Sequence, residues 1–246
     1  MSYNQKKDIY LNYHNLGYDF QIGINKIHPS IFRNHIRVID EILSKDKDMN
    51  ISITFDDGYE GIYKYAKPLL DKTKIKRKKV FIIGDYIGKN NTWDFSFLFN
   101  YYKHLSKNQI RELYQSGWEI GSHGLSHKSF LSMNNSQVKK EVIDSKQILE
   151  DIIDAKVQSI APPFSHINQE VYDLCVEAGY NSIYIQNSVE IQTIEDVNIY
   201  SRNNVYSIDR NLNIIKKVKS SKMENKKEKF ISSFNNLTVL CSKIIK

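Results

Sequence analysis

The sequence is poor in residues that cross-link a chain or interrupt its helices and strands, with two cysteines and four prolines in 246 residues. The two cysteines, Cys175 and Cys241, cannot build the disulfide framework of a small secreted domain, so we expect buried thiols in a reducing compartment. No apolar run approaches the roughly 20 residues of a membrane-spanning helix. The first residues also lack the apolar core of a secretory leader. These absences favour a cytoplasmic protein without a transmembrane segment.

Hydrophobic residues make up 41% of the chain, which is enough for a sizeable core. The length suits a single α/β barrel. The net charge of +7 could indicate nucleic acid, but the basic runs are not interleaved with aromatic residues as a strand-binding surface would be. We therefore expect no nucleic-acid partner. The lysine-rich segment 216–229 could instead lie near anionic phosphates or make a peripheral contact with lipid headgroups.

Short β-branched runs alternate with amphipathic segments, and this alternation predicts an α/β fold. The expected strands are residues 9–13, 51–55, 80–83, 118–120, 157–161, 182–185 and 198–200. The expected helices begin after Ser30 and at Glu60, Asn108, Ser136 and Gln169. After about residue 209 the pattern predicts a helix, a charged interruption and a final helix.

Two polar clusters stand at the ends of expected strands. The first is Asp56-Asp57-Gly58, and the second contains His123 and His127, four residues apart. Imidazole and carboxylate groups are ligands for Zn²⁺ and related divalent ions. Neighbouring residues at a strand end point in roughly opposite directions, so one carboxylate can bind a metal while the other acts as a base. Asp-Gly is also a hairpin signal, but the segment after Gly58 is typical of a helix rather than a returning strand.

Thr54-Phe-Asp-Asp-Gly-Tyr59 and Ser122-His-Gly-Leu-Ser-His127 resemble the first two motifs of the polysaccharide deacetylases (carbohydrate esterase family 4, the NodB homology domain). The resemblance covers about residues 8–208 and implies an irregular (β/α) barrel. It also implies hydrolysis of N- or O-acetyl groups on sugars. We expect residues 1–208 to form the catalytic domain and residues 209–246 a basic helical extension packed on or beside it.

The resemblance assigns Asp56 as the general base and Asp57, His123 and His127 as the metal ligands. The family's third motif is approximately Arg-x-Pro-Tyr-Gly, whereas this chain has Ala161-Pro-Pro-Phe-Ser165. The oxyanion-binding backbone N–H then belongs to Phe164. The family arginine that orients the base is missing here, so we expect Asp56 to be less well positioned than usual.

The histidine of the last family motif is also missing, because no histidine follows His166. One branch of the family begins instead with a strand that ends in Tyr-His, and Tyr13-His14 matches that pattern. We therefore assign His14 as the general acid and keep His166 in reserve. Three further residues are assigned to substrate contact together with His166: Tyr59, Trp93 and Pro163. Three other histidines are expected on the surface: His28, His35 and His104.

These assignments predict a metal-dependent deacetylase that uses Zn, with Co, Ni, Fe or Mn as the other candidates. The absence of a leader points to an acetylated carbohydrate made inside the cell, such as a nucleotide- or lipid-linked sugar. Two alternatives stay open. One is a hydrolase of another amide, such as a deformylase, on the same fold. The other is a degenerate sugar-binding module without catalysis.

Overall fold

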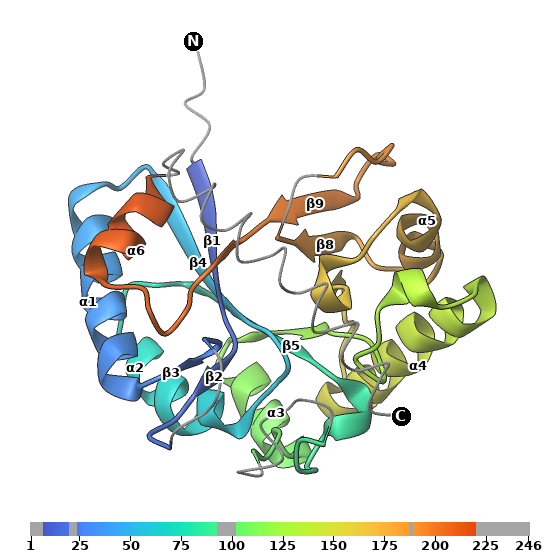
Figure 1. The fold of residues 1–246 in the computed structure, drawn as a ribbon, viewed down its shortest axis with the longest axis horizontal. Helices are drawn as coiled ribbons and strands as arrows, with labels where there is room; N and C mark the ends of the chain where they lie inside the picture. The colour runs from blue at the N-terminus through green and yellow to red at the C-terminus, as the bar shows by residue number, and fades with distance from the viewer. Residues whose placement is uncertain (1–6, 20–23, 93–101, 187–188, 220–246) are drawn as a thin grey trace.

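The fold is a nearly closed barrel of parallel strands wrapped by helices (Figure 1). The computed structural model describes residues 7–19, 24–92, 102–186 and 189–219. Eight strands form one sheet in the order β10-β1-β4-β5-β6-β7-β8-β9, and every pairing in it is parallel. The predicted irregular (β/α) barrel is confirmed.

The barrel strands carry apolar side chains outward and a mixture of polar and aromatic side chains inward. In β1 (Lys7–Tyr13), Ile9, Leu11 and Tyr13 belong to the main apolar core, together with residues of the surrounding helices. Tyr10, between them in sequence, packs in a separate small cluster with Phe81 and residues of other strands. Because side chains alternate along a strand, this split assigns one set to the helices and the other to the barrel interior.

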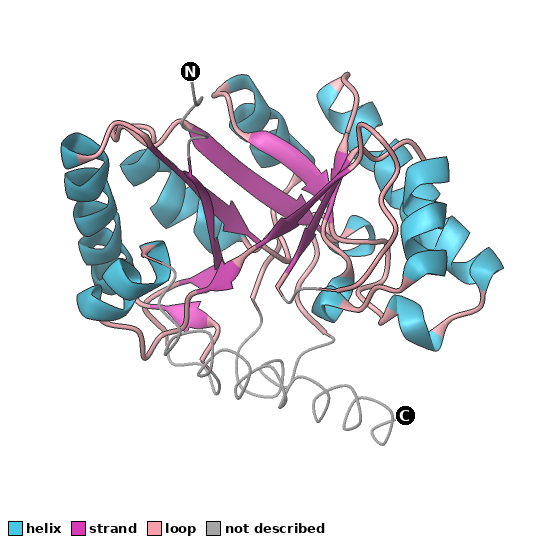
Figure 2. Ribbon diagram, turned by 90° about the horizontal axis from the view of Figure 1, so that it is seen from above, coloured by secondary structure: helices cyan, strands magenta, loops and turns pink. Residues whose placement is uncertain are grey.

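The helices lie on two flanks of the barrel (Figures 1 and 2). Helices α1 and α6 pack together on one flank, and α4 and α5 on the other. The helices are α1 (Pro29–Lys45), α2 (Lys67–Leu70), α3 (Lys107–Gln115), α4 (Asn135–Ile153), α5 (Gln169–Glu177) and α6 (Asn211–Val218). Single turns are η1 (Ile62–Ala66), η2 (Gly84–Tyr86), η4 (Phe130–Ser132) and η5 (Pro163–Ser165).

The remaining barrel strands are β4 (Met49–Phe55), β5 (Arg77–Ile82), β6 (Glu119–Ser122), β7 (Ser159–Ile160), β8 (Ser182–Ile185), β9 (Asn198–Ser201) and β10 (Asn203–Asn204). A separate parallel pair, β2 (Asn15–Leu16) and β3 (Lys26–Ile27), follows β1. The sequence predicted most of these strands, but the 157–161 run pairs over only two residues, because it turns after Ile160 into the proline-rich segment.

Two helical segments differ from the prediction by more than a residue or in type, and α3 and α4 begin one residue earlier than predicted. Helix α1 begins at Pro29 rather than after Ser30, because the His28 side chain accepts the Ser30 N–H and caps the helix. The segment from Glu60 to Leu70 is helical as predicted, but its centre is a π-helical turn, η1, that runs directly into α2.

The first helix of the C-terminal region, α6, is part of the helical layer around the barrel. Ile214 and Val218 of α6 are fully buried in the main core, and α6 packs against α1. The predicted final helix, which contains Phe230, Phe234, Leu237 and Leu240, lies outside the described residues. Among the described residues, no helix combines the length and apolar character that crossing a bilayer requires.

Truncating Ile214 to alanine should therefore lower the free energy of unfolding by about 2–5 kcal/mol, the usual cost of deleting a buried aliphatic side chain. Leu212→Ala is the matched control, because Leu212 lies on the same helix but is 70% exposed. Urea denaturation of both variants tests this. Equal losses in the two variants would show that α6 does not belong to the cooperative unit.

Candidate functional site

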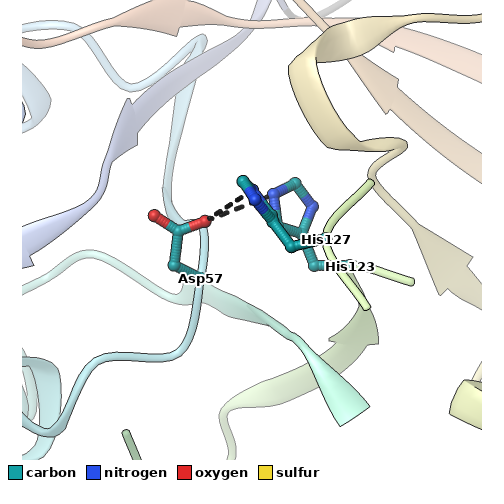
Figure 3. Close-up of side chains that lie close together, drawn as sticks. All are labelled: Asp57, His123 and His127. Carbon is teal, nitrogen blue, oxygen red and sulfur yellow. Dashed lines mark ion pairs between the residues drawn. The ribbon is translucent and has the colours of Figure 1, made fainter. Parts of the chain in front are cut away.

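Three buried side chains converge at the carboxyl ends of β4 and β6 (Figure 3). Asp57 follows β4, and His123 and His127 follow β6. Oδ1 of Asp57 lies 3.4 Å from Nε2 of His123 and 3.2 Å from Nε2 of His127. Within the described residues, no other group of three acidic, histidine or cysteine side chains is arranged to hold a metal ion.

These spacings fit one metal ion. Nitrogen and oxygen ligands at about 2.0–2.1 Å from a tetrahedral ion lie about 3.3–3.4 Å from one another, and the two measured Asp57–histidine distances match that edge. The carboxyl is also in its ligand form. Burial alone would raise the pKa of Asp57, but the facing imidazoles hold it well below its usual value. Three protein ligands leave room for water or substrate, as in catalytic metal sites.

The two histidines are held by contacts outside the metal group. Nδ1–H of His123 donates to the Ala161 carbonyl at 2.6 Å, which leaves Nε2 as the ligand atom. The loop that carries His127 is fixed by Glu141 of α4, whose Oε2 accepts the N–H groups of Leu125 at 2.7 Å and Ser126 at 2.9 Å. A carboxylate that accepts two backbone N–H groups sets the direction of the loop and thereby the position of His127.

The backbone is strained where the site is built. Asp57, His127 and Phe164 all have positive φ, at 69°, 58° and 60°, a conformation that costs a non-glycine residue free energy. His104 supports the first of them, because its Nδ1 lies 2.9 Å from the Asp57 carbonyl oxygen. Burial lowers the pKa of His104 to about 4, so its ring is neutral and donates through Nδ1. The predicted surface position of His104 is wrong.

Asp56, next in sequence to the metal ligand Asp57, is buried in the barrel interior, where Arg202 holds it in a two-pronged ion pair. The guanidinium donates from NH1 to Oδ1 at 2.6 Å and from NH2 to Oδ2 at 3.0 Å. Asn12 donates to Oδ2 at 2.9 Å. Both charged residues are about 1% exposed. Burial alone would raise the pKa of Asp56, but the charge and hydrogen bonds of Arg202, together with the charges of His123 and His14, outweigh burial and hold the pKa below its usual value.

Two further histidines and the third motif line the same end of the barrel. The Phe164 ring lies 5.0 Å from the His127 ring and 5.7 Å from the His166 ring. His166 is anchored through Nδ1, 2.7 Å from Ser129 Oγ. His14 is half-buried and directly follows β1, which pairs with β4, and its charge contributes to the low pKa values of Asp56 and Asp57.

The family model described as polysaccharide deacetylase matches residues 44–183, which include both the aspartate pair and the histidine pair. The chain belongs to the polysaccharide deacetylase family. YxkH of Bacillus subtilis, provisionally named a polysaccharide deacetylase, is 30% identical over 142 residues, 56% of this chain and 46% of the relative. The poly-β-1,6-N-acetyl-D-glucosamine N-deacetylase of Staphylococcus aureus is 27% identical over 139 residues, 53% of this chain and 45% of the relative.

The fold of this member of the polysaccharide deacetylase family is shared over most of its length with solved structures. The Streptococcus pyogenes deacetylase PplD, in complex with acetate, superposes with a TM-score of 0.68 at 15% identity, covering 85% of this chain and 97% of that one. At that identity the likeness concerns the fold alone. The matches to the curated relatives span about half of their length.

The expectation of a poorly positioned Asp56 is wrong. The third motif lacks the family arginine, but a different arginine takes its place. Arg202, which lies between β9 and β10 near the C-terminal end of the barrel, forms an ion pair with the Asp56 carboxylate. It is the most important residue that the sequence interpretation missed. Strand alternation at most places Arg202 on the same face as Tyr200, two residues earlier, and it does not identify Asp56 as the partner.

The residues assigned to substrate contact, and the remaining histidines and cysteines, differ in how exposed they are. Tyr59 is buried and stacks on His104 at 4.6 Å, and Pro163 is buried too. His28 is exposed as predicted, whereas His35 is buried, with Nε2 3.0 Å from the Asp209 carbonyl oxygen. Its predicted surface position is wrong. Trp93 and Cys241 lie outside the described residues, and Cys175 is buried as predicted.

Replacing Arg202 by methionine should lower the free energy of unfolding by about 3–5 kcal/mol, because it leaves the Asp56 carboxylate buried and uncompensated. Arg77→Met is the matched control. Arg77 pairs with Asp8 at 3.2 Å at an exposed site, where an ion pair contributes only about 0–1 kcal/mol. Chemical denaturation of both variants measures the difference. Comparable losses would mean that the Asp56–Arg202 pair does not stabilise the barrel.

Proposed function

We propose that this chain is a metal-dependent hydrolase that removes an acetyl group from an N- or O-acetylated sugar of a glycan or glycan intermediate. The observation that carries the proposal is the pair of adjacent carboxylates in different environments. Asp57 faces two imidazoles at metal-ligand spacing, while Asp56 is kept charged by Arg202. One carboxylate is thereby arranged to bind the ion, and the other is kept ionised and oriented so that it can act as a base.

Asp57, His123 and His127 would hold the ion, with Zn as the first candidate and Co, Ni, Fe or Mn as the others. When bound, such an ion lowers the pKa of a coordinated water and polarises a carbonyl oxygen. Asp56 accepts the proton of the attacking water as the general base. Arg202 and Asn12 hold its two oxygens, so the carboxylate keeps one orientation while it does so.

The charge that develops on the acyl oxygen needs a donor fixed in advance. The η5 turn offers the Phe164 N–H, because the hydrogen bonds across this turn are donated by Ser165 and His166, to Pro162 and Pro163. The left-handed conformation of Phe164 and Ser165 sets the direction of this peptide. We assign oxyanion binding to this group.

His14 is the proposed general acid, which returns a proton to the leaving amine or alcohol. Its Nδ1 is buried without a hydrogen-bond partner among the described residues. His166, by contrast, is tied to Ser129. A free ring nitrogen beside both carboxylates suits proton transfer better than an anchored one.

The S. aureus relative is named for a deacetylase of poly-β-1,6-N-acetyl-D-glucosamine, which supports an N-acetylated amino sugar as the substrate here. A nucleotide- or lipid-linked form, a cytoplasmic location and a contact of the basic C-terminal region with lipid headgroups remain predictions. Of the alternatives, the non-catalytic module is disfavoured, because sugar binding alone does not need a buried carboxylate that is kept charged at the cost of burying an arginine.

Asp56→Asn should lower kcat by about 10²–10⁴-fold, the usual contribution of a general base, and leave metal binding unchanged because all three ligands remain. Acetate release from N-acetylated sugars in free, oligomeric and nucleotide-linked form is the assay, with metal content measured in parallel. Asp48→Asn, at an exposed aspartate, is the control. Full activity in Asp56→Asn would remove the base assignment. Release of formate but not acetate from matched substrates would favour the deformylase alternative.

His14→Gln and His166→Gln separate the two candidates for the general acid. On an N-acetylated sugar, His14→Gln should lose about 10²–10⁴-fold in kcat and His166→Gln much less. On an aryl acetate, whose leaving group departs without a proton, His14→Gln should keep most of its activity. The reverse order of losses on the sugar would transfer the role to His166. Equal losses on both substrates would mean that His14 positions the site rather than donating a proton.

A further inference from the structure

A second cavity, of about 310 Å³, opens at the end of the barrel opposite the metal group. Its rim is formed by three exposed charged residues near the starts of their strands, Asp8 of β1, Arg77 of β5 and Glu119 of β6. The metal group instead lies at the carboxyl ends of the strands, and none of its residues lines this cavity. The two sites are therefore separated by the length of the barrel interior.

Aromatic rings form one wall of the cavity. Tyr184 and Tyr200 stack with their centroids 4.8 Å apart, and Tyr10 meets Tyr184 edge-on at 5.5 Å. Tyr10 and Tyr184 are buried, while Tyr200 is half-buried. Packed rings of this kind give a rigid wall, and the half-buried Tyr200 is the ring of the three that remains accessible to a ligand that presents C–H groups.

The deep part of the cavity is polar and incompletely satisfied. Lys79 Nζ donates to Tyr184 Oη at 2.7 Å and pairs with Glu119 at 2.6 Å. Ser52 lines the same cavity, is 2% exposed, and its Oγ has no hydrogen-bond partner among the described residues. A buried hydroxyl without a partner destabilises a fold, so its presence here points to a ligand that completes its hydrogen bonds.

The charges around the cavity are already neutralised by one another. Arg77 pairs with Asp8 at 3.2 Å and Lys79 with Glu119. The third basic residue of the lining, Lys78, pairs with Asp71 at 2.9 Å. A phosphate or nucleotide would need unpaired positive charge, and a purely apolar ligand would leave these groups without partners. What suits the lining is a neutral ligand whose groups both donate and accept hydrogen bonds.

We propose that this cavity binds a single neutral sugar residue, so that the protein has a second carbohydrate-binding site remote from its metal group. A pyranose ring presents C–H groups to the tyrosine wall and hydroxyls to Ser52, Lys79 and the paired rim charges. The volume is at the lower end of the range for small-ligand pockets, roughly 300–1,000 Å³, which suits one sugar rather than a longer glycan. The site does not depend on the proposed hydrolysis.

The test is a binding titration on the unsubstituted full chain, kept free of metal by a chelator so that no acetyl group is removed during the measurement. Asp56 is left in place because its replacement would leave Arg202 uncompensated beside Tyr184 of the cavity. N-acetylglucosamine is the probe, inorganic phosphate is the comparison, and calorimetry with saturation-transfer NMR is the readout. Ser52→Ala and Tyr200→Ala alter the cavity. Tyr114→Ala is the matched control, because Tyr114 is 39% exposed on α3 and does not line the cavity.

We expect Tyr200→Ala to weaken sugar binding about tenfold or more and Ser52→Ala about three- to tenfold, with no change for Tyr114→Ala or for phosphate. Ser52→Ala also controls for loss of the fold. It deletes only a hydroxyl without a partner in the described part of the chain, so its melting temperature should equal or exceed that of the parent. Sugar binding that is undetectable in the parent, or unaffected by both cavity variants, would overturn the proposal. So would phosphate binding that Ser52→Ala abolishes.

Discussion

A buried carboxylate that must stay charged constrains the inside of this barrel. Asp56 is almost fully removed from water, and without compensation its neutral form would be favoured. Arg202 supplies that compensation from the single position between β9 and β10, the two edge strands of the sheet. Its N–H also bonds the Ile185 carbonyl of β8 at 2.8 Å. The residue that brings the two edges of the barrel together is therefore the one that keeps the proposed base ionised.

The rest of the site depends on left-handed backbone conformations that these residues would not favour without support from the surrounding fold. A left-handed non-glycine residue costs on the order of 1–3 kcal/mol, and the site contains such a residue in each of its three segments, at Asp57, His127 and Phe164. His104 and Glu141 support the first two from a separate loop and from α4. The ligand positions are thus set by the surrounding fold before any metal binds, which favours a preorganised site over one assembled by the ion.

The sequence predicted the parts of the site that are short local motifs, and it missed the contacts between residues far apart in the chain. The Asp56-Asp57-Gly58 and His123–His127 clusters are short patterns at strand ends, and local spacing was enough to pair them. Arg202 lies 146 residues from Asp56, in a weak strand pattern, and nothing nearby in sequence marks it as a partner. His104 was missed for a similar reason, since its burial depends on an isolated bridge to Tyr59 rather than on its own segment. Apolar periodicity predicted the alternation of strands and helices, because the strands bury their outer faces, and the family resemblance implied the barrel. Neither carries information about which polar inner residues meet.

Inside the barrel, two cations, Arg202 and Lys79, lie against aromatic rings between the metal group and the second cavity. The Arg202 guanidinium lies 5.0 Å from the Phe81 ring centre and 6.0 Å from that of Tyr184. Lys79 lies 3.9 Å from the same Tyr184 ring on the side of the second cavity. Burial, with a smaller contribution from the Arg202 charge, lowers the pKa of Lys79 to about 8. Two like charges can share this interior because each is paired with a carboxylate at its own end, Arg202 with Asp56 and Lys79 with Glu119, and because the Tyr184 ring lies beside both cations.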